Sequence, residues 1–197
     1  MNSKAQSELA FWRQYFVDSG GAEHYMAARD SGAMGHHLEF FGKYLSSQKG
    51  PGLDVGPGLV SIFEFLPGIE SMYSIEPLQV EMDKIFSPPT GRVVRVAGSG
   101  ENMPFADGQF QFVYCANVID HTPNPDRMLS EIERVLAPGG RFYFNVNFDK
   151  ELWVPGHYSL WTPDIVAEKL QRFTLVDSYE YARPEYNQRL YWGVYTK

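Results

Sequence analysis

Residues 53–61 read Leu-Asp-Val-Gly-Pro-Gly-Leu-Val-Ser, and they organise the interpretation of the rest of the chain. The apolar start is typical of the end of a buried strand, the glycines of a tight turn, and the stripe over residues 59–66 of a helix. Gly56 and Gly58 leave room for a ligand beside the free N–H groups of a helix start. Glu76 follows 20 positions after Gly56, at the end of a second strand-like run. A carboxylate at that place predicts contact with the ribose hydroxyls of a nucleotide.

The glycine spacing indicates which nucleotide is expected. A dinucleotide fingerprint has a third glycine or alanine where this chain has Ser61, so a pyrophosphate fits poorly. The sequence Asp54-Val55-Gly56-Pro57-Gly58 resembles instead the first motif of the class I S-adenosylmethionine-dependent methyltransferases, an acidic residue followed by Gly-x-Gly. The resemblance implies a set of cofactor-binding residues at the ends of the first two strands: Asp54, Gly56, Gly58, Glu76 and Leu78.

Composition limits the other possibilities. With 197 residues, 44% of them apolar, the chain has the size and the core of one α/β domain. A formal charge of −7 and scattered basic residues argue against a nucleic-acid partner. The single cysteine, Cys115, excludes an internal disulfide and fits a reducing compartment. Because we find neither a signal-peptide core nor an apolar run of membrane-spanning length, we expect a cytoplasmic protein without a membrane partner.

Two amphipathic helical stripes precede the glycine turn. We therefore expect residues 1–50 to form a helical cap of the same domain, followed by the cofactor-binding core over residues 51–197. The cap is either a mobile lid over the site or a fixed cover of one sheet face. As a lid, it offers Tyr25 and His36 as contacts for the acceptor.

The loop over residues 98–110 carries a second part of the resemblance. Its sequence, Gly-Ser-Gly-Glu-Asn-Met-Pro-Phe-Ala-Asp-Gly-Gln-Phe, is similar to the segment with which small-molecule methyltransferases hold the adenine edge. The resemblance implies cofactor contacts from Ser99, Gly100 and Glu101. The chain departs from the family pattern at Ser99 and at Gln111, which both replace an aspartate. Ser99 still offers a hydrogen-bond acceptor to the adenine amino group, and Glu101 is the other candidate.

Two further segments follow in the family's order. Asn117 comes just after a fourth strand-like run, and it either contacts the methionine end of the cofactor or forms an ordinary strand-end turn. Residues 129–141, Leu-Ser-Glu-Ile-Glu-Arg-Val-Leu-Ala-Pro-Gly-Gly-Arg, resemble the family's segment before the fifth strand. The resemblance implies a Rossmann-like three-layer α/β sandwich. Its sheet is seven-stranded and mostly parallel, in the order 3-2-1-4-5-7-6, with an antiparallel strand at the end.

Two histidines are candidates for acid–base catalysis, because an oxygen or nitrogen acceptor loses a proton as it gains a methyl group. His121 follows the fourth strand, beside the expected methyl donor, and we prefer it to His157. In the family a histidine at this position also serves as a brace for the loop, which is the alternative role. Tyr158 and Trp161 either line an acceptor pocket or pack over the sheet edge.

These features predict a methyltransferase that uses S-adenosylmethionine and methylates an oxygen or nitrogen atom of a small-molecule acceptor. We expect no metal, because Asn117-x-x-Asp120-His121 replaces both glutamates of the Glu-x-x-Glu-His metal motif of ubiquinone-pathway O-methyltransferases. Two alternatives come from other classes, a nucleotide-dependent oxidoreductase and a non-catalytic cofactor-binding partner subunit. The sequence makes no prediction about the oligomeric state.

Overall fold

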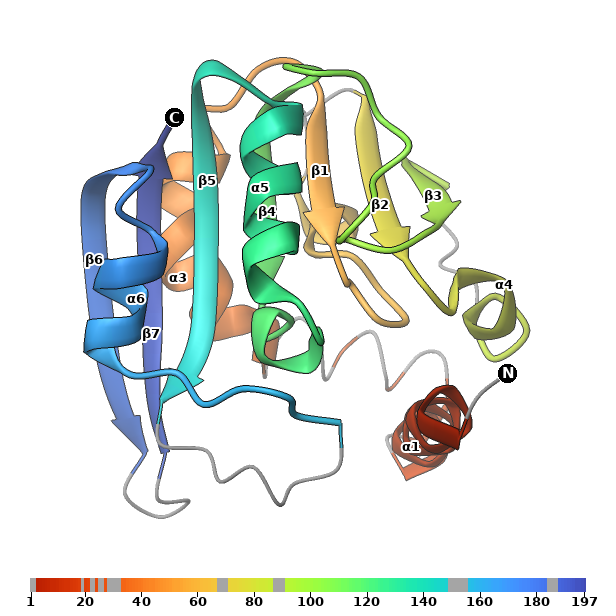
Figure 1. Cartoon of the computed structure of the whole chain (residues 1–197). Coiled ribbons are helices and arrows are strands. Elements are labelled where there is room, and N and C mark those ends of the chain that lie inside the picture. Colours follow the sequence, from red (N-terminus) through yellow and green to blue (C-terminus); the bar gives the residue numbers. More distant parts are fainter. Residues whose placement is uncertain are drawn as a thin grey trace.

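The computed structural model describes residues 3–18, 20–21, 24, 27, 33–66, 71–86, 91–148, 156–183 and 188–197. One seven-stranded sheet forms the centre, in the order β3-β2-β1-β4-β5-β7-β6 (Figure 1). The strands are β1 (Gly52–Val55), β2 (Met72–Glu76), β3 (Val93–Ala97), β4 (Phe110–Ala116), β5 (Leu136–Phe148), β6 (Thr174–Arg183) and β7 (Gln188–Thr196). The predicted fold class and strand order are confirmed.

Strand direction brings the predicted site residues to one edge of the sheet. Neighbouring strands from β3 to β5 pair in parallel, whereas β7 pairs antiparallel with both β5 and β6. Val55, the last residue of β1, is opposite Ile75 of β2 and Cys115 of β4. The carboxyl ends of β1, β2 and β4 therefore lie together, which is where parallel α/β sheets bind their ligands.

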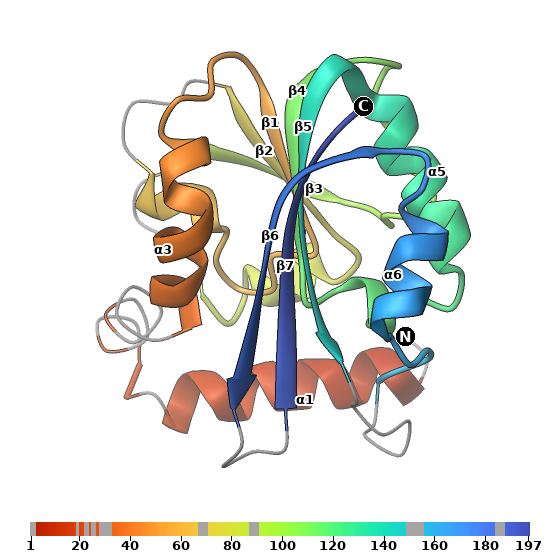
Figure 2. The ribbon, with the colours of Figure 1, turned by 90° about the vertical axis from the view of Figure 1, so that its left-hand side faces the viewer.

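Helices cover both faces of the sheet (Figure 2). Helix α3 (Ala33–Leu45) packs Phe41 and Leu45 onto one face, and α5 (Pro125–Val135) and α6 (Pro163–Lys169) cover the other. The start of α5 is set by Asn124, whose side chain accepts a hydrogen bond from the backbone N–H of Arg127 at 3.0 Å, and by Pro125 in the first turn. Among the described helices, none has the length and apolar character needed to cross a membrane.

Helix α1 (Ser3–Asp18) covers neither face. It lies across the carboxyl ends of the strands, below the sheet in Figure 2. Trp12 and Phe16 pack there against a small cluster that includes Leu78 and Phe86, and the rings of Phe16 and Phe86 are 5.4 Å apart. The two predicted N-terminal helices thus have different positions, since only α3 covers a sheet face. Most of the segment that joins them lies outside the described residues.

Three element boundaries differ from the sequence-based expectation. Instead of a helix over residues 59–66, the described chain has a single 3-10 turn, η1 (Ile62–Phe65). Leu66 is already extended, at φ −108° and ψ 99°, because Pro67 disfavours the helical conformation in the residue before it. The apolar stripe after Pro77 predicts a helix over residues 78–86, but α4 covers only Gln79–Met82. The fifth strand is expected to start at Phe142, after the segment over residues 129–141, whereas β5 begins directly after α5.

Candidate active site

A tight turn follows β1 at the edge where the strands end. Gly56 and Gly58 have φ values of 68° and 65°, in the left-handed region that favours glycine. A Cβ on Gly56 would lie 2.6 Å from Val118, and one on Gly58 would lie 2.5 Å from the Trp12 ring. The turn is therefore closely packed on both sides, and α1 touches it directly through Trp12.

Asp54 holds this turn from inside the protein. Its carboxylate is buried, and Oδ2 accepts hydrogen bonds from Ser61 Oγ at 2.6 Å and from the backbone N–H of Ile62 at 3.2 Å. Ser61 Oγ in turn accepts a hydrogen bond from the backbone N–H of Phe63 at 3.2 Å. Ser61, which stands where a dinucleotide fingerprint has glycine or alanine, thus has a structural role in this chain. The described contacts of Asp54 are with the turn, and its direct contact with the cofactor stays a prediction.

Glu76, at the end of β2, carries the most perturbed carboxylate of this edge. The residue is 5% exposed, and Oε1 accepts a hydrogen bond from the backbone N–H of Leu78 at 3.1 Å. The pKa of Glu76 is raised to about 7, mainly by burial; the N–H groups of Leu78 and Gly58 lower it in part, and the negative charges of Glu8 and Asp54 add to the rise. A desolvated carboxylate that has few donors is suited to accept hydrogen bonds from the hydroxyl groups of a ligand.

The loop after β3 is fastened to the start of α5. Ser99 Oγ accepts a hydrogen bond from the backbone N–H of Glu101 at 3.1 Å, and a Cβ on Gly100 would lie 2.6 Å from Met128 Cε. Glu101 Oε1 accepts hydrogen bonds from Thr122 Oγ1 and from the backbone N–H of Asn124, the latter at 2.8 Å. Glu101 therefore braces two loops, and the proposed adenine contact falls more naturally to Ser99.

Asn117 lies directly after β4 and has an unusual backbone. Its φ is 56°, and its side-chain oxygen accepts a hydrogen bond from Asn147 Nδ2 at 2.8 Å. Asparagine tolerates this left-handed conformation better than most residues, at a cost in free energy that is typical of functional positions. The residue is exposed at the shared edge of the strands, as a contact for the cofactor requires.

Next to Asn117, the structure brings both predicted catalytic histidines together around Asp120. The short turn η2 (Ile119–His121) carries Asp120 and His121, and the ring centroids of His121 and His157 are 4.2 Å apart. His157 Nε2 lies 3.3 Å from Asp120 Oδ2, and His121 Nε2 lies 3.9 Å from Asp120 Oδ1. We call Asp120, His121 and His157 the Asp-His-His cluster.

The residues predicted to contact the acceptor do not all lie at this site. Trp161 is 2% exposed and packs against Phe144 with a centroid distance of 5.6 Å, which supports the alternative that it packs on the sheet; its acceptor role stays a prediction. Tyr158 is 48% exposed and remains available. His36 is part of α3, but its side chain is not described, and Tyr25 lies outside the described residues.

Two site features were missed by sequence reasoning. Asp120 was noted only as a member of a metal-motif spacing, and the contact of Trp12 with Gly58 was not foreseen. The position of Asp120 beside the preferred histidine was a usable signal for the first. The sequence contains no comparable signal for the second, because it depends on how α1 lies across the strand ends.

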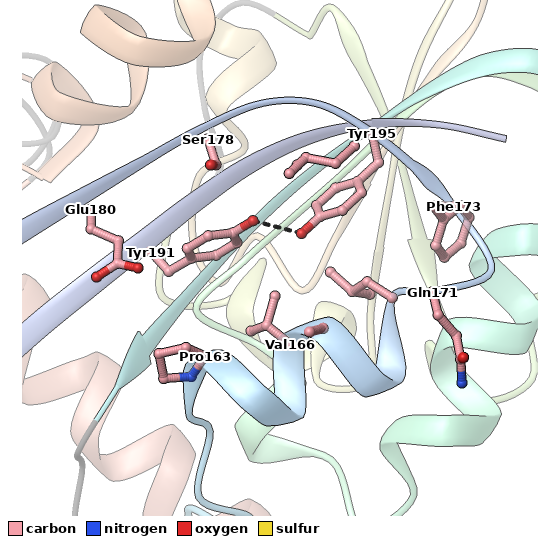
Figure 3. A pocket seen from close by; sticks show the side chains of 11 residues that line it. Pro163, Val166, Gln171, Phe173, Ser178, Glu180, Tyr191 and Tyr195 are labelled. Carbon is pink, nitrogen blue, oxygen red and sulfur yellow. Dashed lines mark hydrogen bonds between the residues drawn. The ribbon is translucent and has the colours of Figure 1, made fainter.

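A cavity of about 350 Å³ lies elsewhere, between α6 and the β6–β7 hairpin (Figure 3). Tyr191 and Tyr195 line it, with their hydroxyl oxygens 2.6 Å apart. None of its eleven lining residues is a predicted site residue. We therefore place the candidate site at the carboxyl ends of the strands, where the polar groups described above converge.

The packing of Trp12 on Gly58 leads to a stability prediction with a matched control. Gly58→Ala and Gly91→Ala both introduce a Cβ at positive φ, 65° and 61°, but only Gly58 has a ring in the way, since nothing lies within 4 Å of a Cβ on Gly91. We expect Gly91→Ala to lower the free energy of unfolding by about 1–2 kcal/mol and Gly58→Ala by at least about 1 kcal/mol more. Urea denaturation measures both. Equal losses would show that Trp12 does not pack on the turn.

Comparison of the sequence with known proteins supports a cofactor site at the carboxyl ends of the strands. Residues 53–144 match the methyltransferase domain family. Over this stretch, which is just under half of the chain, the sequence is that of a methyltransferase domain. Human thiol S-methyltransferase TMT1A is 38% identical over 98 residues, which are 47% of this chain and 40% of the human protein. The chain spans less than half the length of such curated relatives.

Solved structures share the fold of this methyltransferase domain at low sequence identity. N-methyltransferase NodS from Bradyrhizobium japonicum WM9 has a TM-score of 0.67 and 16% identity, with 83% of this chain and 95% of NodS covered. The [4+2]-cyclase SpnF has a TM-score of 0.68 and 15% identity, with 82% of this chain and 80% of SpnF covered. Since one of these neighbours is named a cyclase, the fold alone does not decide the reaction.

The matched domain confirms the predicted class and its cofactor, S-adenosylmethionine. The described residues fit this cofactor. The turn at Gly56 and Gly58 has no room for a side chain, and the desolvated carboxylate of Glu76 lies at the end of the neighbouring strand. Both features are what a ribose with two hydroxyl groups beside a close-approaching backbone requires.

Proposed function

We propose that this chain transfers the methyl group of S-adenosylmethionine to an oxygen or nitrogen atom of a small-molecule acceptor. One observation carries the proposal: the glycine turn after β1 and the buried carboxylate of Glu76 after β2 lie side by side in a methyltransferase domain. The net charge of −7 favours a small acceptor over a nucleic acid.

In this proposal the main role of the protein is to bind the cofactor and the acceptor and to orient them. S-adenosylmethionine supplies an activated, cationic methyl group. Glu76 accepts hydrogen bonds from the ribose hydroxyls, the turn at Gly56 and Gly58 admits the backbone side of the ligand, and Asn117 contacts the methionine end. Alignment of the acceptor with the methyl group and exclusion of water account for the rate acceleration expected of such a site.

The acceptor is proposed to lie beside the Asp-His-His cluster. An oxygen or nitrogen acceptor must lose a proton, and an imidazole near neutrality is a suitable recipient. The buried carboxylate of Asp120 lies 3.9 Å from His121 Nε2 and 3.3 Å from His157 Nε2, close to both imidazoles. The thiol acceptor named for the human relative adds sulfur to the atoms worth testing, because a thiol also loses its proton before it is methylated.

A direct test is to incubate the purified chain with S-adenosylmethionine and a panel of small alcohols, phenols, amines and thiols, and to detect S-adenosylhomocysteine. We expect one class of acceptor to give product above the rate of spontaneous release. Binding of labelled S-adenosylmethionine is measured alongside binding of NADH. Preference for NADH would instead favour the oxidoreductase, and tight cofactor binding without turnover on any acceptor would favour the partner subunit.

The contact of Trp12 with Gly58 and the nearness of Glu8 to Glu76 support α1 as a lid rather than a fixed cover. We expect amide hydrogen exchange in α1, Ser3–Asp18, to slow when S-adenosylhomocysteine is added, because ligand binding orders elements that open at low free energy. Helix α3 serves as the internal control, since it is packed on the sheet with or without ligand. Unchanged exchange in α1 would identify it as a fixed part of the fold.

A further inference from the structure

We propose that the Asp-His-His cluster binds a divalent transition-metal ion of the zinc class. Asp120, His121 and His157 each offer one ligand atom, and these atoms all lie within 4.8 Å of one another. The sequence analysis expects no metal, because Asn117 and Asp120 replace both glutamates of the metal motif, and its spacing includes only Asp120 and His121 of the three ligands. The third, His157, comes 37 positions after Asp120 on a different loop.

The first observation is the buried carboxylate. The Asp120 side chain is 2% exposed, and within the described residues neither of its oxygens accepts a hydrogen bond. A buried carboxylate without hydrogen bonds is costly unless a positive charge lies beside it. The positive charge is either a protonated imidazole or a bound cation. Asp120 Oδ2 lies 3.3 Å from His157 Nε2, and Oδ1 lies 3.9 Å from His121 Nε2.

The ligand types favour a particular group of ions. One carboxylate and two imidazoles form a set that suits zinc, iron, cobalt or nickel, whereas magnesium and calcium prefer a shell of oxygen atoms. Two ligands of one tetrahedral zinc lie about 3.3 Å apart, given metal–ligand distances of about 2.0–2.1 Å. The Nε2 to oxygen separations, 3.3 Å and 3.9 Å, are at or above that distance, and the three ligand atoms lie within 4.8 Å of one another, so closure on an ion requires the side chains to move inward.

The arrangement is held by the backbone as well as by the side chains. The backbone N–H of Tyr158 donates a hydrogen bond to the Asp120 carbonyl oxygen at 2.7 Å, which joins the loop of His157 to η2. Gly156 lies next to His121 on this loop and has a φ of 95°, in the left-handed region that favours glycine. His157 is nearly buried, whereas His121 is 32% exposed, so the cluster is closed on one side and open on the other.

Three protein ligands leave a fourth position for water or for a bound molecule, as in catalytic zinc sites. The metal site stands independently of the reaction, but its role rests on the proposed function: an acceptor oxygen, nitrogen or sulfur would occupy the fourth position. Coordination lowers the pKa of such a group, and its proton leaves to solvent. The ion, rather than an imidazole, would then prepare the acceptor.

The test uses the full chain without an affinity tag, stripped of metal with a chelator. Isothermal titration with zinc chloride is expected to show one equivalent, bound with a dissociation constant of about 1 μM or below. Titration with cobalt(II) gives a second readout, because a visible absorption of tetrahedral type reports imidazole and carboxylate ligation directly. Absence of zinc binding at micromolar concentration, or of the cobalt spectrum, overturns the proposal.

Variants locate the ion. Asp120→Asn and His157→Ala are expected to weaken zinc binding by about 100-fold or more. His24→Ala, which removes an exposed histidine outside the cluster, should bind zinc as the parent does. Binding that persists in both cluster variants overturns the assignment. Affinity for S-adenosylhomocysteine, measured in the same variants, shows that they are folded.

The two proposals fail separately. If the stripped protein binds S-adenosylhomocysteine but no zinc, only the metal site is lost. If it binds zinc at the cluster but yields no product from the acceptor panel, the proposed function is lost and the metal site stands.

Discussion

Glu76→Ala raises the dissociation constant for S-adenosylhomocysteine more than tenfold while the sheet stays folded; this is the first result we expect. The carboxylate would accept two ribose hydroxyl bonds, and hydrogen bonds to a charged group contribute about 1.5–3 kcal/mol each. Calorimetric titration measures the change. Glu76→Asp, which keeps the charge, should lose less affinity. An unchanged dissociation constant in Glu76→Ala would remove Glu76 from the site.

A matched control exists for this variant. Glu64, on η1, is also a buried carboxylate whose pKa is raised by burial, but its charged neighbours are Arg95 and Arg92 rather than the site. Glu64→Ala is therefore expected to change cofactor affinity by less than about threefold. Comparable losses in Glu64→Ala and Glu76→Ala would mean that any buried acid matters, and would contradict a specific ribose contact.

The raised pKa of Glu76 gives opposite pH dependences to binding and to stability. Ribose hydroxyls bind the ionised form, so affinity is complete above pH 7 and falls by about tenfold per unit below it. The stability of the unliganded protein depends on pH in the opposite direction. A raised pKa means stability that is present below about pH 4.5 and is lost as the pH rises to 7, on the order of 3 kcal/mol in total. In Glu76→Gln, calorimetric affinity for S-adenosylhomocysteine and the free energy of unfolding should both lose this pH dependence.

His121→Ala should lower turnover about 100-fold or more without changing affinity for S-adenosylhomocysteine. The reason is its position: its imidazole is the exposed member of the Asp-His-His cluster, and neither its ring contact with His157 nor its approach to Asp120 involves the cofactor turn. Steady-state kinetics on an acceptor found in the panel measure the first quantity, and calorimetry measures the second.

The alternative role of His121 as a brace makes a different prediction. In that case melting temperature and cofactor affinity drop together, because η2 would lose its support. The control is His24→Ala, for which turnover, melting temperature and affinity should all equal those of the parent chain. If His121→Ala changes neither turnover nor stability, His121 has no role in either sense, and His157→Ala is the next variant to measure.

Much of the fold was predictable because its signals are local. Helix α5 has a proline in its first turn and an apolar stripe, and it begins at Pro125 as these signals predict, although it ends at Val135, before the expected stop at Pro138. The strand order came from family resemblance rather than from periodicity. The helix expected after the glycine turn was wrong since its apolar stripe is equally consistent with a buried 3-10 turn, and Pro67 ends it early.

The positions of the candidate site residues could be predicted where they follow the strands, but not where loops meet. Gly56, Gly58 and Glu76 are fixed by the ends of β1 and β2, so their convergence follows from strand order alone. The meeting of Asp120 with His157 depends on the path of an irregular loop, which no periodic pattern encodes. For the same reason the sequence left two alternatives for Trp161, an acceptor pocket or packing on the sheet, and the structure buries it.

Glu101 has a further consequence for catalysis. One carboxylate oxygen ties the loop after β3, expected at the adenine, to the turn that carries Asp120 and His121. Any shift of the first loop on contact with the nucleotide is therefore passed to the second through a charged hydrogen bond, without passing through the sheet. In the proposed reaction, the loop at the donor and the loop at the acceptor thus share one carboxylate. We expect such a link to favour an order of substrate binding in which the cofactor enters first and leaves last.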